Sequence, residues 1–172
     1  MRFYLLFFTV TGLLLSAFSL AAADARVSII IDDMGYRATD KLAFDLPHHI
    51  TFAILPHTLQ SKQFAELAHQ QGRTVMLHLP METLQPKRLG PGALLANMNA
   101  DSIAYTLDQA LKTVPQASGV NNHMGSKLTQ LTFPMTTLME ALAERQLFFI
   151  DSRTTKFTKA HEIALQSGVP VL

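Results

Sequence analysis

The chain has 172 residues, a formal net charge of +1 and no cysteine. The near-neutral charge and the lack of any lysine- or arginine-rich run exclude the basic surface of a nucleic-acid-binding domain, so nucleic acid is not an expected partner. The lack of cysteine excludes disulfides and thiolate ligands. A bound metal would therefore be held by histidine and carboxylate side chains.

The N-terminal segment, residues 1–23, has the layout of a secretory signal peptide. Arg2 precedes an apolar stretch from Phe3 to Leu20, and three alanines follow. Small residues suit cleavage by a signal peptidase, and the boundary falls between positions 23 and 25. An uncleaved membrane anchor is the alternative, although the apolar core is short beside the about 20 residues of a bilayer crossing. We expect an exported protein, periplasmic or secreted, with no membrane span after cleavage.

The remainder, residues 24–172, is expected to form one α/β domain. Short β-branched or apolar runs predict strands at residues 27–31, 51–55, 74–77, 119–120 and 147–150. Amphipathic stretches predict helices at residues 61–71, 101–114 and 134–143, the second of them capped by Asp101. Such alternation favours parallel strands joined by right-handed crossovers. Residues 168–172 predict the start of a sixth strand, so we expect the fold to be incomplete at this end.

The segment from Met81 to Asn99 interrupts the alternation. It is rich in proline and glycine and has little periodicity, which predicts a long surface loop. Because it follows the carboxyl end of the third predicted strand, where parallel α/β folds bind ligands, it could form one wall of a substrate groove. A simple connection between two elements is the alternative.

Two adjacent acids, Asp32 and Asp33, follow the first predicted strand. Neighbouring carboxylates at the exit of a buried strand are costly unless a bound cation compensates them. Side chains alternate between the two faces of a strand, so both acids address one site only if the chain turns there, which Gly35 permits. Alternatively, Asp33 caps a turn or a helix.

Two histidines end the next strands along the same edge. His78 follows the third predicted strand and His123 the fourth. Either imidazole alone would more often be structural, but parallel strands bring their exits together. One carboxylate and two imidazoles are a suitable ligand set for Zn²⁺ with an open water position.

Four further residues near these strand ends are candidates for contacts with substrate or for support of the ligands. They are Asn122, Ser126, Asp151 and Arg153. Asp151 could orient a ligand histidine, and Arg153 could balance the acids; structural capping is the alternative role for both. The other five histidines show no such convergence and are expected at the surface.

Four segments together resemble the divergent polysaccharide deacetylase family. They are Ile31-Asp32-Asp33-Met34-Gly35-Tyr36, His78-Leu79-Pro80-Met81, Asn121-Asn122-His123-Met124-Gly125-Ser126 and Asp151-Ser152. The resemblance implies a distorted (β/α) barrel related to carbohydrate esterases that remove N-acetyl groups. Matched by position, Asp33, His78 and His123 look like the ligands of a divalent metal ion, expected to be Zn²⁺, and Asp32 looks like the catalytic base.

The resemblance also implies a hydrolase that acts on carbon–nitrogen bonds other than peptide bonds, with an N-acetylated polysaccharide or oligosaccharide as its partner. Related deacetylases protonate the leaving amine with a late histidine, and the sequence has no counterpart of this motif before Leu172. The barrel is therefore expected to be truncated before its last strands. The alternative function is a non-catalytic envelope domain that binds a glycan or a protein.

Overall fold

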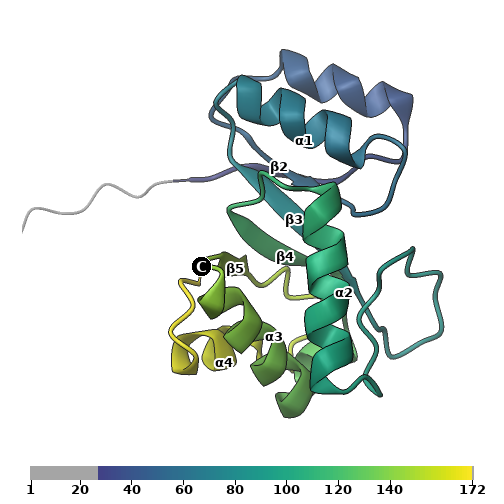
Figure 1. The fold of residues 1–172 in the computed structure, drawn as a ribbon, viewed down its shortest axis with the longest axis vertical. Helices are drawn as coiled ribbons and strands as arrows, with labels where there is room; N and C mark the ends of the chain where they lie inside the picture. The colour runs from purple at the N-terminus through teal and green to yellow at the C-terminus, as the bar shows by residue number, and fades with distance from the viewer. Residues whose placement is uncertain (1–26, 172) are drawn as a thin grey trace, which may run out of the picture.

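The computed structural model describes residues 27–171, so the predicted signal peptide, residues 1–23, lies outside the described part. One parallel sheet organises this part, and each strand in it pairs with its neighbours in chain order (Figure 1). The strands are β1 (Ile30–Met34), β2 (Thr51–Ile54), β3 (Val75–Met81), β4 (Gly119–Met124) and β5 (Phe148–Ile150). The predicted α/β architecture with parallel strands is confirmed.

Helices connect the strands. Two are 3₁₀ helices, η1 (Ala38–Asp45) and η2 (Leu128–Gln130), and four are α-helices, α1 (Ser61–Gln70), α2 (Ala100–Thr113), α3 (Thr132–Glu144) and α4 (Ala160–Gln166). Figure 1 shows η1 and α1 at one end of the sheet, α3 and α4 at the other, and α2 between them. Right-handed crossovers between consecutive neighbouring strands place their helices on one face of the sheet. The opposite face is thereby left for a binding site.

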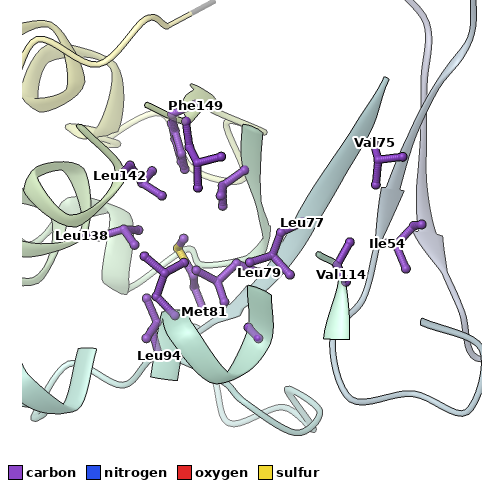
Figure 2. Close-up of a cluster of buried hydrophobic side chains, with 14 of the residues drawn as sticks. Ile54, Val75, Leu77, Leu79, Met81, Leu94, Val114, Leu138, Leu142 and Phe149 are labelled. Atoms are coloured by element: carbon purple, nitrogen blue, oxygen red, sulfur yellow. The ribbon is translucent and has the colours of Figure 1, made fainter. Parts of the chain in front are cut away.

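The central strand β3 shows how the two faces differ. All seven of its residues are buried. Val75, Leu77, Leu79 and Met81 belong to the hydrophobic core; Figure 2 shows Met81 near Leu94, which precedes α2, and Val75 near Ile54 of β2. Side chains alternate along a strand, so His78 points to the opposite face. The sheet thus buries its core on the helical side and carries its histidine on the other.

A cluster of aromatic rings and a buried arginine hold η1 against the sheet. The ring of Phe44 in η1 lies 5.0 Å from that of Phe52 in β2 and 5.5 Å from that of Phe64 in α1. The Arg73 guanidinium lies 4.7 Å from the Phe52 ring centroid and donates hydrogen bonds to the carbonyl oxygens of Phe44, Pro47 and Leu46. These contacts satisfy a charged group that is only 3% exposed, and they fix the segment after β1.

The predicted closure of the sheet into a barrel is not shown. Within residues 27–171, β1 and β5 are the edges of an open five-stranded sheet. Val171 forms a single parallel bridge with Phe149, which agrees with the sixth strand predicted to begin in this region. No helix in the described part has the length and apolarity needed to cross a membrane.

Several predicted boundaries were wrong where polar residues continue a strand. β1 begins at Ile30 and includes Asp32 and Asp33, while β3 and β4 continue past His78 and His123. The candidate residues therefore lie within the strands and not after them. α2 is capped by Asn99, whose Oδ1 accepts a hydrogen bond from the Ser102 amide at 2.9 Å, and not by Asp101. The predicted loop is confirmed for residues 82–99, whereas Met81 is the last residue of β3. Leu94 in this loop is buried and forms a bridge with Met81.

Candidate metal centre

A bulge in β1 brings both acids to one face of the sheet. Ile31 pairs with Phe52 and Met34 with Ile54, so β1 has one residue more than β2 between these two pairs. Asp33 takes the left-handed conformation, with φ 61°. Because Ile31 and Met34 both pack against the core, Asp32 and Asp33 between them both face the other side.

The chain turns at Gly35, as the sequence predicts, but this turn is not what orients the two acids. Its φ is +122°, and an added Cβ would lie 2.5 Å from the Thr58 Oγ1 atom. Glycine is therefore required where the chain leaves β1 and passes close to Thr58. The shared orientation of the two acids comes from the bulge.

Strand register brings the two histidines together. In the pairing of β3 with β4, His78 is opposite Asn121, and Pro80 is opposite His123. His78, Asn121 and His123 therefore share the face without helices. The two imidazole rings lie edge to face, with their centroids 4.9 Å apart.

The side chains of Asp33, His78 and His123 converge on one point. Asp33 Oδ1 lies 2.8 Å from His123 Nδ1 and 3.1 Å from His78 Nε2, and these two nitrogens lie 3.1 Å apart. Ligand atoms about 2.0–2.2 Å from a tetrahedral Zn²⁺ lie about 3.3–3.6 Å from one another. The three atoms are thus already close to the spacing of a coordination sphere, and the group could hold a metal ion.

Asn121 links this group to Asp32. Its Nδ2 donates to Asp32 Oδ1 at 2.9 Å, and its Oδ1 lies 2.8 Å from His78 Nδ1. An ionised carboxylate can only accept, so the amide must turn its NH₂ toward Asp32 and its oxygen toward His78. His78 Nδ1 then donates to the Asn121 oxygen, and Nε2 is left on the side of Asp33 and His123, where a metal ligand is required.

The surroundings of His123 favour the neutral imidazole that a metal ion binds. Burial is the largest cause that lowers its pKa, and the neighbouring His78 lowers it further. Asp33 and Asp32 act in the opposite direction without reversing the shift. The proton therefore competes weakly with a cation for Nδ1.

Comparison with known proteins identifies the family. Residues 29–172 match the model of the family described as divergent polysaccharide deacetylase. The chain belongs to this divergent polysaccharide deacetylase family.

Two bacterial relatives of this deacetylase-family chain are named as uncharacterized. This chain is 37% identical over 159 residues to the protein YibQ of Escherichia coli K12. The match covers 92% of this chain and 50% of YibQ. This chain is also 37% identical over 152 residues to a protein of Haemophilus influenzae Rd, covering 88% and 54% respectively. The chain thus spans about half the length of these curated relatives.

A solved structure supports the fold of this family member. The crystal structure of the uncharacterized protein ATU2773 from Agrobacterium tumefaciens C58 superposes with a TM-score of 0.79 at 22% identity. The match covers 87% of this chain and 64% of that one. At this identity the likeness concerns the fold alone.

The other sequence-predicted residues of this deacetylase-family site make contacts away from the three converging side chains. Asn122 points to the other face of β4, where its Oδ1 accepts from the Ser152 amide at 2.9 Å. The Asp151 carboxylate accepts from the Arg153 amide and from the Thr158 hydroxyl. Ser126 Oγ accepts from the Leu84 amide at 3.2 Å, and the Arg153 side chain is exposed. Of the predicted set, the structure brings together Asp32, Asp33, His78 and His123.

Sequence reasoning missed Asn121 as part of the site. Its position two residues before His123 in a strand was the available signal, because residues at i and i+2 share a face. Asn122 drew attention instead because it adjoins His123 in the sequence.

A hollow opens directly beside the converging side chains. Its volume is about 520 Å³, and its wall includes Asp32, Asp33, Tyr36, Arg37 and His123. A larger hollow of about 670 Å³ lies elsewhere, between the loop after β3 and Lys127. We take the smaller hollow as the candidate site, because it is the one that adjoins the candidate metal ligands.

Proposed function

We propose that the chain is a metal-dependent hydrolase that removes N-acetyl groups from an envelope or extracellular glycan. The observation that carries this proposal is the convergence of Asp33, His78 and His123 beside an open hollow, with a second acid, Asp32, next to them. Membership of a family described as polysaccharide deacetylases supports the same reaction and a glycan substrate.

The residues present suit a divalent cation, and we propose Zn²⁺ as the ion. Its ligands would be one carboxylate oxygen of Asp33, Nε2 of His78 and Nδ1 of His123, a mixed oxygen and nitrogen set that zinc favours. The side chain of Asp33 is 64% exposed, which leaves the solvent side of the group open to water and substrate. When bound, such an ion lowers the pKa of a coordinated water and polarises the acetamide carbonyl.

Asp32 is the proposed general base. Asn121 holds its Oδ1 by a hydrogen bond, and the side chain remains 44% exposed at the wall of the hollow. A carboxylate held in this way can accept a proton from water as the oxygen attacks the carbonyl carbon. Asp33 would then serve as a metal ligand and Asp32 as the general base.

We also propose that the domain is exported to the periplasm or secreted, after removal of residues 1–23, with the cut placed between positions 23 and 25. The charge and hydropathy of the N-terminal segment support this proposal. Closure of the sheet into a distorted barrel is likewise proposed, and a consecutive parallel strand order is compatible with it.

Metal binding and acetate release test the proposed reaction separately. Dialysed protein should retain about one Zn²⁺ per chain, and His78→Ala or His123→Ala should abolish retention. His69→Ala, an exposed residue of α1, is the matched control and should retain the ion. The metal-site proposal would be refuted if the parent protein neither retains Zn²⁺ nor gains thermal stability from added Zn²⁺.

The second measurement is acetate released from N-acetylated oligosaccharides. Asp32→Asn should keep the metal and lose acetate release, because it removes the base and leaves the ligands. Glycan binding without acetate release by the parent protein would instead favour a non-catalytic binding domain.

A further inference from the structure

Tyr36 lines the hollow beside the candidate ligands and a second hollow as well. The Tyr36 side chain is 56% exposed and lines that hollow together with Asp32, Asp33 and His123. It also lines a second hollow, of about 420 Å³, whose other residues are Arg88, Gly90 and Pro91. One aromatic ring therefore separates two adjoining spaces, each large enough for part of a chain-like ligand.

The loop after β3 forms the far wall of the second hollow. Gly90 has φ +91°, and an added Cβ would lie 2.8 Å from the Tyr36 hydroxyl oxygen. Gly92 makes a similar close approach to the His57 ring, at 2.7 Å. The loop between Met81 and Asn99 thus reaches back to the segments that follow β1 and β2. This contact agrees with the sequence-based expectation that the loop forms a wall.

The two spaces differ in charge. The wall of the first contains three carboxylates, those of Asp32, Asp33 and Asp40, and one guanidinium, that of Arg37. The wall of the second contains no acid, and its one charged group is the guanidinium of Arg88. Among residues 27–171 this guanidinium makes neither an ion pair nor a hydrogen bond. An unpaired guanidinium presents a planar set of donors that matches a carboxylate.

We propose that the site takes an acidic N-acetylated glycan, which runs from the Asp33, His78 and His123 group across Tyr36 to Arg88. The acetamido sugar lies in the first space, the neighbouring sugar packs on the exposed Tyr36 ring, and a carboxylate of that neighbour contacts Arg88. This inference rests on the proposed deacetylase function and adds to it the charge of the substrate.

Two oligosaccharides that differ only in charge test the inference. One is a hexasaccharide of alternating N-acetylglucosamine and glucuronic acid, and the other is the same compound with its carboxylates reduced to alcohols. Binding is measured by calorimetry with Asp32→Asn protein, first with a chelator and then with Zn²⁺. We expect the acidic compound to bind about 10-fold more tightly than the reduced one, and the difference to shrink with added salt.

Variants then assign the effect to the second space. Arg88→Gln should bring the affinity for the acidic compound down to that for the reduced one and leave the latter unchanged. Tyr36→Ala should weaken both compounds. Lys112→Gln, an exposed cation in α2, is the control and should alter neither affinity.

The inference is overturned if the reduced compound binds as tightly as the acidic one, if neither binds, or if Arg88→Gln weakens both equally. Failure of the deacetylase proposal would look different. In that case no acetate is released by the parent protein, while the preference for the acidic compound and its dependence on Arg88 remain.

Discussion

Replacing Asn121 by leucine would remove a side chain that forms hydrogen bonds with both His78 and Asp32, and would leave a residue of similar volume in its place. Two hydrogen bonds are lost, of 2.8 Å to His78 and 2.9 Å to Asp32. Asn121 is only 2% exposed, so water cannot readily replace the lost partner of His78. Loss of such a supporting contact typically lowers metal affinity by about 10- to 100-fold.

The tautomer of His78 gives a readout that is independent of activity. In the metal-free parent protein, nitrogen chemical shifts of the imidazole should show the proton on Nδ1, and in Asn121→Leu both tautomers should be populated. Zinc affinity, measured by competition with a chelator, should fall by about 10- to 100-fold.

The neighbouring asparagine provides the control. Asn122→Leu changes the same residue type in the same strand, but its side chain contacts Ser152 and Met124 on the other face. It should lower stability and leave the His78 tautomer as in the parent. An Asn121→Leu protein with the parent tautomer and undiminished zinc affinity would refute the role given to Asn121.

Three further changes test the fold around the site. Arg73→Met should lower the free energy of unfolding by about 2–4 kcal/mol in urea titrations, because buried carbonyl oxygens lose their donor; a loss below about 0.5 kcal/mol would contradict this. Gly119→Ala should lower stability by about 1–3 kcal/mol, since the new Cβ would lie 2.3 Å from the Phe148 ring, and an unchanged melting temperature would count against this packing. The hydrogen bond from Lys127, and then that from the Ala96 amide, lower the pKa of Glu82 below its ordinary value of 4.5. This stabilisation is present above the ordinary value and is lost as pH falls through the lowered pKa, so the stability advantage over Glu82→Gln should disappear in acid; an advantage independent of pH would argue against the ion pair.

The alternation of strands and helices was readable from the sequence because buried strands and amphipathic helices have distinct periodicities. The ends of the strands could not be read from the sequence, because strand pairing continues into polar residues. Asp32 and Asp33 lie inside β1, and His78 lies in the middle of β3. An apolar run shows where a strand is buried. The length of the strand depends instead on the hydrogen bonds that it forms with the neighbouring strands.

The sequence predicted that Asp32, Asp33, His78 and His123 lie near one another, but it did not predict the bulge and the strand register that bring them together. A bulge adds one residue to a strand without a distinctive residue type, and the φ of 61° at Asp33 has no signal in the sequence. The place of Asn121 depends on the register between β3 and β4, which pairs it with His78. Register comes from contacts between distant segments, so a single sequence constrains it weakly.

The extra residue in β1 has a consequence for how such a site could be gained or lost. The bulge consists of Asp32 and Asp33, so deleting one residue there would restore strict alternation and would remove one of the two carboxylates. The strand would keep its pairing with β2, but a single acid would then have to serve both proposed roles. A protein without the extra residue could still bind a cation through its remaining side chains. Only the protein with the extra residue would also have a second acid that can activate water beside the cation.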